Sequence, residues 1–184
     1  MVNKWKKTSV KHKGSFKIFD VKKQTYINPM TGEEVPTFVI KSNDWINIIA
    51  TTLDDEIVLI KQFRFGSNKV ELEIPGGLVE NGEEPAAAAA RELKEETGYA
   101  GDEAVLIGAV NPNPAIHEHT CYTYWIPRCQ KVQEPSFDDA NEIIETELAS
   151  VNNVKKHVKE GRITHSLVID AIFWFLLKME KILV

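Results

Sequence analysis

The segment from Gly77 to Tyr99 constrains this chain most, because one short stretch holds a helix start, a helix end and a dense set of glutamates. Pro85 suits the first position of a helix, where its missing N–H group costs nothing. Gly98 suits the position just past a helix end, where the backbone turns left-handed. Between them lie five consecutive alanines, the residue with the highest helix propensity. The sequence therefore predicts a helix from about Pro85 to Thr97.

Three glutamates of this helix share one face. Glu92 and Glu96 are four residues apart and Glu95 lies beside them, so their carboxylates gather on one side. Like charges at this spacing repel, which makes the cluster a poor choice for stability alone. Hard carboxylate oxygens suit Mg²⁺ or Mn²⁺, which bind through a few carboxylates together with phosphate and water oxygens. A bare E-x-x-E-E is more often a solvated helix face, with Arg91 and Lys94 offsetting its charge, so the surrounding sequence decides.

A Pro75-Gly76-Gly77 loop precedes the helix and directly follows the strand-like residues 70–74. Glycine lets backbone carbonyl and amide groups approach an ion or a phosphate closely, although an isolated Pro-Gly-Gly is usually a plain turn. Loop and helix together fit the pattern G-x5-E-x7-R-E-U-x-E-E-x-G-U, where U is aliphatic or aromatic. Every fixed position is matched: Gly77, Glu83, Arg91, Glu92, Leu93, Glu95, Glu96, Gly98 and Tyr99.

This pattern is the Nudix box, and on these residues the chain resembles the Nudix hydrolases. The resemblance implies four metal-binding groups, one carbonyl oxygen and three carboxylates: Gly76, Glu92, Glu96 and Glu95, the last as a third ligand or as a group that orients water. Glu83 and Arg91 resemble the family's ion pair that orients the ligands. The implied cofactor is Mg²⁺, with Mn²⁺ as the alternative.

Composition and charge fit a small enzyme. The chain has 184 residues, 43% of them hydrophobic and 27% charged, which is enough for one well-buried domain with a modest extension. The net charge of −5 argues against general nucleic-acid binding. Residues 171–177 are the longest apolar run and are too short to span a bilayer. Cys121 and Cys129 make no disulfide framework, and the N-terminus lacks the apolar core of a signal peptide, so a cytoplasmic setting is expected.

The order of apolar segments predicts an α/β fold, in which a mixed sheet is sandwiched between helices. Strands are expected before and after the glutamate-rich helix at 47–53, 57–63, 71–74, 104–110, 120–127 and 143–149. Two more helices are expected at 152–160 and 166–182, and the second is apolar on nearly all sides, which implies burial against the sheet.

The first fifty residues differ in character, with expected strands at 15–20, 24–27 and 35–41. Three short strands bury little apolar surface on their own, so they should lean on the main domain or on another subunit. We therefore divide the chain into a small N-terminal antiparallel β extension, residues 1–43, and a Nudix-type α/β/α sandwich, residues 44–184.

The resemblance extends beyond the box. Residues 60–65 and 71–77, like the strand-rich extension, are similar to the ADP-ribose and nucleoside-diphosphate-sugar pyrophosphatase branch. Pro114 lies sixteen residues past Gly98, where that branch carries a proline, although a loop this rich in turn residues contains prolines in any case. Residues 113–117 replace the usual Pro-Gly continuation, which leaves the sugar unidentified. The resemblance also implies a homodimer formed through the extension, each subunit contributing to the other's site.

Six residues are candidates for substrate contact: Arg64, Trp45, Phe38, Glu73, Pro114 and His117. The planar guanidinium of Arg64 pairs well with phosphate oxygens, and a salt bridge to Glu71 or Glu73 is an equal alternative. Trp45 and Phe38 stack on the nucleobase if they act as aromatics of this region do in the family, or else they lie in the core. His117 and His119 could form a metal or catalytic pair, but with no third ligand in the sequence, substrate contact or a plain surface position is favoured.

The general base is expected outside the box, on an acidic loop that matches the glutamate-bearing loop of the branch, residues 138–145. Glu142 aligns best, at the junction of loop and strand, and Glu145 is the alternative. A carboxylate there needs only to reach a metal-bound water. Ordinary solvation is the competing explanation for an acidic loop.

The sequence thus predicts a metal-dependent pyrophosphohydrolase. It would cleave the diphosphate of ADP-ribose, or of a related nucleoside diphosphate sugar, into a nucleoside monophosphate and a sugar phosphate. The alternatives are a Nudix hydrolase of nucleoside triphosphates or dinucleoside polyphosphates, and a nucleotide-sensing Nudix domain without catalysis. Sensors commonly lose box glutamates, whereas this chain keeps all of them. We expect neither a nucleic-acid nor a membrane partner.

Overall fold

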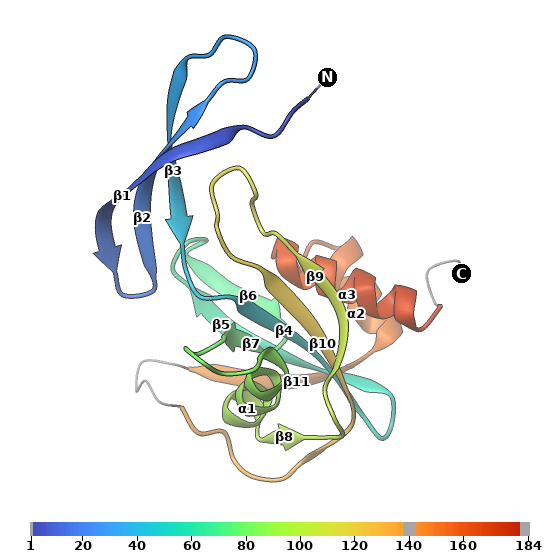
Figure 1. Cartoon of the computed structure of the whole chain (residues 1–184). Helices are drawn as coiled ribbons and strands as arrows, with labels where there is room; N and C mark the ends of the chain where they lie inside the picture. Colours follow the sequence, from blue (N-terminus) through green and yellow to red (C-terminus); the bar gives the residue numbers. More distant parts are fainter. Residues whose placement is uncertain (1, 138–142, 181–184) are drawn as a thin grey trace. The chain divides into compact units, whose positions relative to one another are not determined.

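A computed structural model describes residues 2–137 and 143–180, which fold into two compact units (Figure 1). The N-terminal unit comprises Met1–Asp44 and Asn111–Thr120, and the main unit comprises Trp45–Val110 and Cys121–Val184. The segment 111–120 joins the N-terminal unit although it lies in the middle of the chain, which the contiguous division of the sequence did not anticipate. The division at residue 43 itself stays a prediction.

The main unit is built on a mixed sheet, as the sequence predicted. Within the described residues it has eight strands: β4 (Trp45–Thr52), β5 (Glu56–Arg64), β6 (Lys69–Glu73), β7 (Gly76–Leu78), β8 (Tyr99–Ala100), β9 (Val105–Val110), β10 (Cys121–Lys131) and β11 (Ile144–Ser150). Strands β4 and β10 pair in parallel at the centre, and the pairings around them are antiparallel. A parallel pair needs a long crossover connection, and the segment from β7 through α1 (Pro85–Thr97) and β9 provides it.

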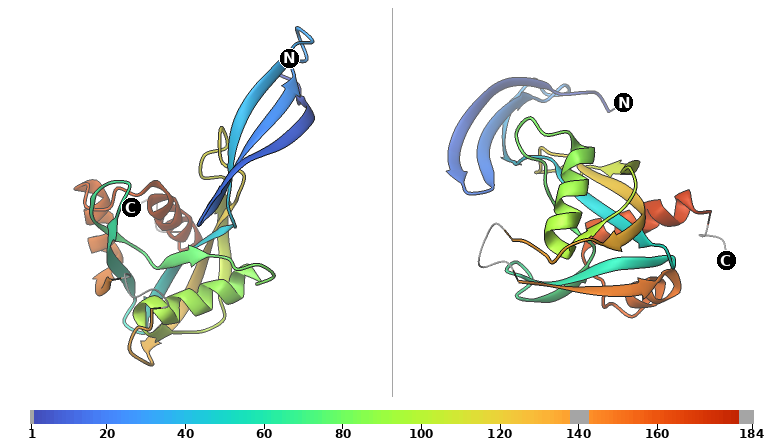
Figure 2. Two further views of the ribbon diagram at one scale, coloured as in Figure 1. Left: turned by 90° about the vertical axis from the view of Figure 1, so that its left-hand side faces the viewer. Right: turned by 90° about the horizontal axis from the view of Figure 1, so that it is seen from below.

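Helices cover both faces of this sheet, which confirms the predicted α/β/α sandwich. Ile48 and Val58 belong to the core that packs against α1. Their strand neighbours Ile49 and Ile57 point the other way, into a core shared with α2 (Val151–Lys159) and α3 (Ser166–Lys178). This alternation follows from the two-residue period of a strand. Figure 2 shows α1 and α3 on opposite sides of the sheet.

Helix α1 has the bounds that its sequence predicts. Pro85 occupies its first turn, and Glu84 at the N-cap makes no side-chain capping bond. Gly98 ends the helix at φ 75°, and its N–H donates to the carbonyl of Lys94 at 2.9 Å. A Cβ at Gly98 would also collide with the carbonyl oxygen of Gln133. The helix end therefore needs glycine both for its left-handed backbone and for the close approach of the chain.

Helix α3 differs in one respect from its prediction. It buries Leu167, Val168, Ala171, Ile172 and Phe175. Phe173 and Leu177 on the other side keep 51% and 43% of their surface exposed, so the helix is buried on one side and not all round. The helix ends at Lys178, and the last residues of the predicted range lie outside the described residues. No helix of the described chain is long and apolar enough to cross a membrane.

The N-terminal unit contains a three-stranded antiparallel sheet of β1 (Lys6–Phe16), β2 (Phe19–Ile27) and β3 (Glu34–Lys41), in that order. The strand predicted at 15–20 is wrong, because the chain turns at Lys17 and Ile18. Phe16 and Phe19 flank this turn and stack with ring centroids 5.0 Å apart. The turn contains neither glycine nor proline, so no turn signal separates β1 from β2 in the sequence.

Candidate active site

Two glycines let strand β7 lie against the glutamates of α1. A Cβ at Gly76 would stand 2.5 Å from the carbonyl oxygen of Ile46 on the paired strand β4. A Cβ at Gly77 would collide with the carboxylate of Glu92. A larger residue at Gly76 would push β7 away from β4, and a larger residue at Gly77 would displace the carboxylate of Glu92. The two glycines therefore serve close packing of loop, strand and carboxylate, beyond the plain turn that the tripeptide alone suggests.

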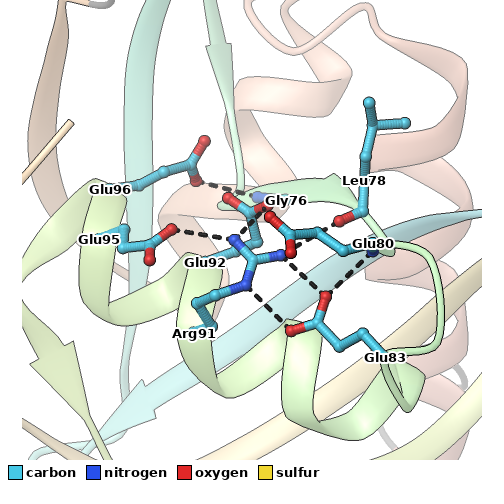
Figure 3. Close-up of polar contacts among 8 residues, drawn as sticks. All are labelled: Gly76, Leu78, Glu80, Glu83, Arg91, Glu92, Glu95 and Glu96. Carbon is cyan, nitrogen blue, oxygen red and sulfur yellow. Dashed lines mark hydrogen bonds and ion pairs between the residues drawn. The ribbon is translucent and has the colours of Figure 1, made fainter. Parts of the chain in front are cut away.

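Glu96 is the most deeply buried carboxylate of the box, with 4% of its surface exposed. The backbone N–H of Gly76 donates to its Oε2 atom at 3.0 Å (Figure 3). A buried carboxylate is costly without such hydrogen bonds. The 3.6-residue period of α1 puts Glu92 one turn earlier on the same face, so both side chains approach β7.

Arg91 binds three of the box glutamates, as Figure 3 shows. Its Nε and Nη2 atoms donate to the two oxygens of Glu83 at 3.0 and 3.1 Å. Its Nη1 atom donates to Glu92 and to Glu95, each at 2.9 Å. Its Nη2 atom also donates to the carbonyl of Leu78 at 3.2 Å. One guanidinium thus connects the loop before α1 to the carboxylates on the face of that helix.

Two members of this network, Glu83 and Arg91, have pKa values shifted toward their charged forms. The hydrogen bond from Arg91 lowers the pKa of Glu83, and the backbone N–H of Glu80, which donates at 3.0 Å, lowers it further. Glu83, followed by Glu92, raises the pKa of Arg91. The pair therefore stays ionised through the neutral range. Arg91 offsets the mutual repulsion of Glu92 and Glu95. The ion pair of Glu83 and Arg91, which the sequence led us to expect, holds the guanidinium in the position where it does so.

The chemistry of these groups fits a hard divalent cation. Carboxylates and a backbone carbonyl are the oxygen donors that Mg²⁺ and Mn²⁺ prefer. Four such donors come from one loop and one helix face: Gly76, Glu92, Glu95 and Glu96. Among the described residues, no three His, Cys, Asp or Glu side chains are already grouped as a metal site. In this structure Arg91 and the N–H of Gly76 hold the carboxylates instead.

Arg64 and Glu73 form a second polar group on the face of the sheet that α1 covers. Arg64 donates to Glu73 through Nε at 3.0 Å and through Nη2 at 2.7 Å. Glu73 is 2% exposed, whereas the side chain of Arg64 is 43% exposed. The structure thus contains the salt bridge that the sequence left as an alternative. Because Glu73 holds one edge of the guanidinium, it also fixes the orientation of Arg64 for any phosphate partner.

The two candidates for the general base differ in placement. Glu142 lies outside the described residues. Glu145 is exposed in β11, and in the register of the two strands it stands opposite Lys61 of β5. Directly paired residues point to the same face, and here it is the face of Leu59, which packs on α2 and α3. Glu145 therefore points away from α1. Lys61 binds Glu147 on that same face, at 2.7 Å.

The remaining candidates divide between the two units. Trp45 begins β4 of the main unit and is half-buried. In the N-terminal unit, Phe38 is 57% exposed and so does not lie in a core. Pro114 is exposed, and His117 is half-buried and stacks on His119 with ring centroids 5.2 Å apart. His119 is itself 8% exposed, and burial, followed by the charge of His117, lowers its pKa.

Comparison with known proteins adds family relationships to this geometry. Residues 44–170 match the model of the NUDIX domain. An ADP-ribose pyrophosphatase of Bacillus subtilis is 28% identical over 140 residues, which cover 76% of either chain. An ADP-sugar pyrophosphatase of Mus musculus is 40% identical over 111 residues, 54% of this chain and 50% of that protein. A crystal structure of an ADP compounds hydrolase covers 99% of both chains with a TM-score of 0.84; at 18% identity it shows a shared fold.

Proposed function

This chain belongs to the Nudix family, and on that premise we propose that it is a pyrophosphohydrolase of ADP-ribose or a related ADP-sugar. The relatives named for ADP-ribose and ADP-sugar pyrophosphatase activity support this substrate class. The observation that carries the proposal is the set of box carboxylates gathered at β7 by Arg91 and by the N–H of Gly76. For ADP-ribose, the products are AMP and ribose 5-phosphate.

Hydrolases of this family generally need divalent cations. The Gly76 carbonyl and the carboxylates of Glu92, Glu95 and Glu96 would hold Mg²⁺ or Mn²⁺, which would supply positive charge to the diphosphate and acidity to the attacking water. The chain's own contribution is to hold these donors in place. The glycines bring the loop to the helix, and the hydrogen bonds of Arg91 keep the carboxylates on one side of it.

The reaction breaks one P–O bond of the diphosphate. The oxygen of a water molecule bonds to one phosphorus, the bridging oxygen leaves with the other phosphoryl group, and a base takes the proton of the water. We assign the base to Glu142 and keep Glu145 as the alternative. Arg64 would bind the diphosphate with the edge of its guanidinium that Glu73 does not hold, and Glu73 would act by orienting it.

The other proposed contacts come from Trp45 of the main unit and from residues of the N-terminal unit. Phe38 and Trp45 would stack on the nucleobase, since aromatic rings bind flat bases with little loss of conformational entropy. Pro114 and His117 would meet the sugar. We further propose a homodimer in which residues 1–43 of one subunit complete the site of the other. The two free cysteines, both buried, suit the reducing cytoplasm in which we place the enzyme.

A substrate panel tests this function. ADP-ribose, other ADP-sugars, dinucleoside polyphosphates and nucleoside triphosphates are each incubated with the full chain and Mg²⁺, and the products are separated by chromatography. We expect AMP and a sugar phosphate, with the highest kcat/KM on ADP-ribose or another ADP-sugar. A triphosphate as the best substrate would instead assign the chain to the other hydrolytic class. Loss of activity with EDTA, restored by Mg²⁺, checks the cation requirement.

A further inference from the structure

Gln24 is the one fully buried residue among the strands of the N-terminal sheet, within the described part of the chain. It is 2% exposed, in the middle of the central strand β2. Among the described residues of the N-terminal unit, only Gln24 and His119 are buried, and both are polar. A buried amide is costly unless its oxygen and its nitrogen both find partners. Gln24 therefore needs a specific environment, although no sequence motif marks it.

The partners of Gln24 come from two places in the chain. The hydroxyl of Tyr26 donates to its Oε1 atom at 2.6 Å. Its Nε2 atom donates to the Oε2 atom of Glu118 at 3.1 Å, across 94 residues of sequence. The hydroxyl can donate only to the amide oxygen, and the carboxylate can accept only from the amide nitrogen, so the two bonds together fix the amide's orientation.

Glu118 lies in the segment 111–120, which backbone bonds attach to the edge of β3. The N–H of Ile40 donates to the carbonyl of Ile116, and the N–H of Glu118 donates to the carbonyl of Ile40, both at 2.8 Å. The carboxylate of Asp44 accepts from the N–H of Thr120 at 2.8 Å. Backbone bonds alone permit a slip along an edge strand. The pair of Gln24 and Glu118 selects one register, because no other register brings that carboxylate to the buried amide.

We propose that Gln24 and Glu118 are positioning residues, which hold the segment 111–120 in the register that offers Pro114 and His117 to the sugar end of the substrate. This inference rests on the proposed function. It gives the extension a role as the scaffold of the segment between β9 and β10, which contacts the sugar. Neither residue touches substrate; each acts through the backbone that the pair fixes.

An exchange of the two side chains tests the pair. Gln24→Glu places the new carboxylate opposite that of Glu118, so the two negative charges repel. Glu118→Gln leaves the amide of Gln24 with a neutral acceptor in place of a charged one. In the double variant, Gln24→Glu with Glu118→Gln, the new carboxylate accepts from both the new amide and the hydroxyl of Tyr26, so the contact is restored with its donor reversed. Each single variant folds without a cavity, because the side chains have nearly the same size.

The kinetic readout is KM against kcat, measured on the best substrate of the panel. We expect Gln24→Glu to raise KM about tenfold and to leave kcat within about twofold of the wild type. This is the pattern for a contact that binds the substrate and its transition state equally well. The double variant should return KM to within about twofold of the wild type, which a merely structural role would not predict. The ratio of kcat/KM between two ADP-sugars should shift in the single variants and recover in the double one.

Amide hydrogen exchange supplies the structural readout. The N–H groups of Ile40 and Glu118 should exchange faster in Gln24→Glu and at the wild-type rate in the double variant. Thr8→Val is the matched control, because Thr8 donates to the carbonyl of Thr25 within the same sheet and does not touch the segment 111–120. It should change neither KM nor the exchange of those two groups.

Two results would overturn the inference. One is a wild-type KM in Gln24→Glu although the two amides exchange faster, since the segment would then be free to move without affecting the substrate. The other is a double variant as impaired as the worse single variant. Wild-type protein that leaves all ADP-sugars intact counts against the proposed function instead. In that case KM of the single and double variants is measured on the substrate that the panel identifies.

Discussion

The two units of this molecule differ in how many apolar side chains they bury. In the main unit, residues such as Ile48, Leu59 and Phe175 are buried and apolar, and each contributes about 1.5 to 3 kcal/mol by leaving water. In the described part of the N-terminal unit the buried residues are Gln24 and His119, which contribute only through their partners. An apolar core tolerates sequence change as long as volume is kept, whereas a unit held by hydrogen bonds depends on particular pairs.

The charges of the two units differ as well. Residues 1–44 and 111–120 contain nine lysines and five acidic residues, whereas the main unit contains 13 lysines and arginines and 22 acidic residues. Lys11 and Lys23 even face each other directly across β1 and β2, an arrangement that costs stability. The overall charge of −5 is therefore the sum of the charges of a basic and an acidic unit. A basic unit lowers the repulsion that an anionic substrate meets.

The largest expected effect concerns the main unit. Glu142→Gln should lower kcat by about 10² to 10⁴, the usual span for a general base, with little change in metal affinity. Glu145→Gln should be milder, because Glu145 lies on the face of Lys61, away from α1. Steady-state kinetics of both variants at saturating Mg²⁺ decide between them. The reverse ranking would move the base to Glu145, and two mild variants would point back to a glutamate of the box.

The second prediction tests the box itself. Glu96→Gln should reduce turnover by about 10² or more, comparable to losing one strong electrostatic group. The amide can still accept from the N–H of Gly76, so circular dichroism and Tm should stay close to the wild type. Glu103→Gln, at an exposed position outside the helix, is the control and should leave turnover unchanged. Turnover of Glu96→Gln within a few-fold of the wild type would refute the ligand assignment.

Removal of residues 1–43 sharpens the contrast between the units. The main unit has its own apolar core and should remain folded and able to bind metal, as followed by circular dichroism and calorimetry. Dimerisation and base binding should be lost, because a dimer of this kind buries about 2,000 Å² or more. The segment 111–120 loses its β3 partner at the same time. A full chain that is monomeric by light scattering and fully active, or a truncated chain with normal activity, would contradict the proposed dimer.

The smallest expected effect is a pH dependence confined to the N-terminal unit. Burial lowers the pKa of His119 from its ordinary 6.5, with a further contribution from the charge of His117, against an opposing one from Asp44. The folded state thus favours neutral His119, and its stabilisation is complete above pH 6.5 and lost as the pH falls through the lowered pKa. Glu118, bound to Gln24, is the other charged group of this segment.

Relative to the intrinsic exchange rate at each pH, the protection of amides in 111–120 should therefore fall between pH 7.5 and 5.5, while the protection of amides in α1 should stay constant. The lowered pKa of Glu83, just before α1, keeps its ion pair with Arg91 charged over this range, so the stabilisation from this pair is lost only at more acidic pH. His119→Gln should remove the pH response of 111–120. An equal response in both regions would show that the two histidines do not control this segment.

The sequence by itself determined the features that depend on near neighbours. The bounds of α1 follow from Pro85, the alanines and Gly98, and the shared face of Glu92 and Glu96 follows from the helical period. The strands and the layered α/β fold follow from apolar alternation, and the box pattern indicated the family that the NUDIX model confirms. Each of these features is read over a window shorter than about 25 residues, where local geometry leaves few choices.

Tertiary structure decided the features that depend on distant partners. The turn at Lys17 and Ile18 exists because β1 pairs back onto β2, and the face of Glu145 depends on its register with β5. Asn111–Thr120 belongs to the N-terminal unit through backbone bonds to Ile40, through the bond of Thr120 to Asp44, and through the bond of Gln24 to Glu118. A buried amide and a carboxylate 94 residues apart leave no periodic signal, because their meeting is fixed by strand register and not by their neighbours in the chain.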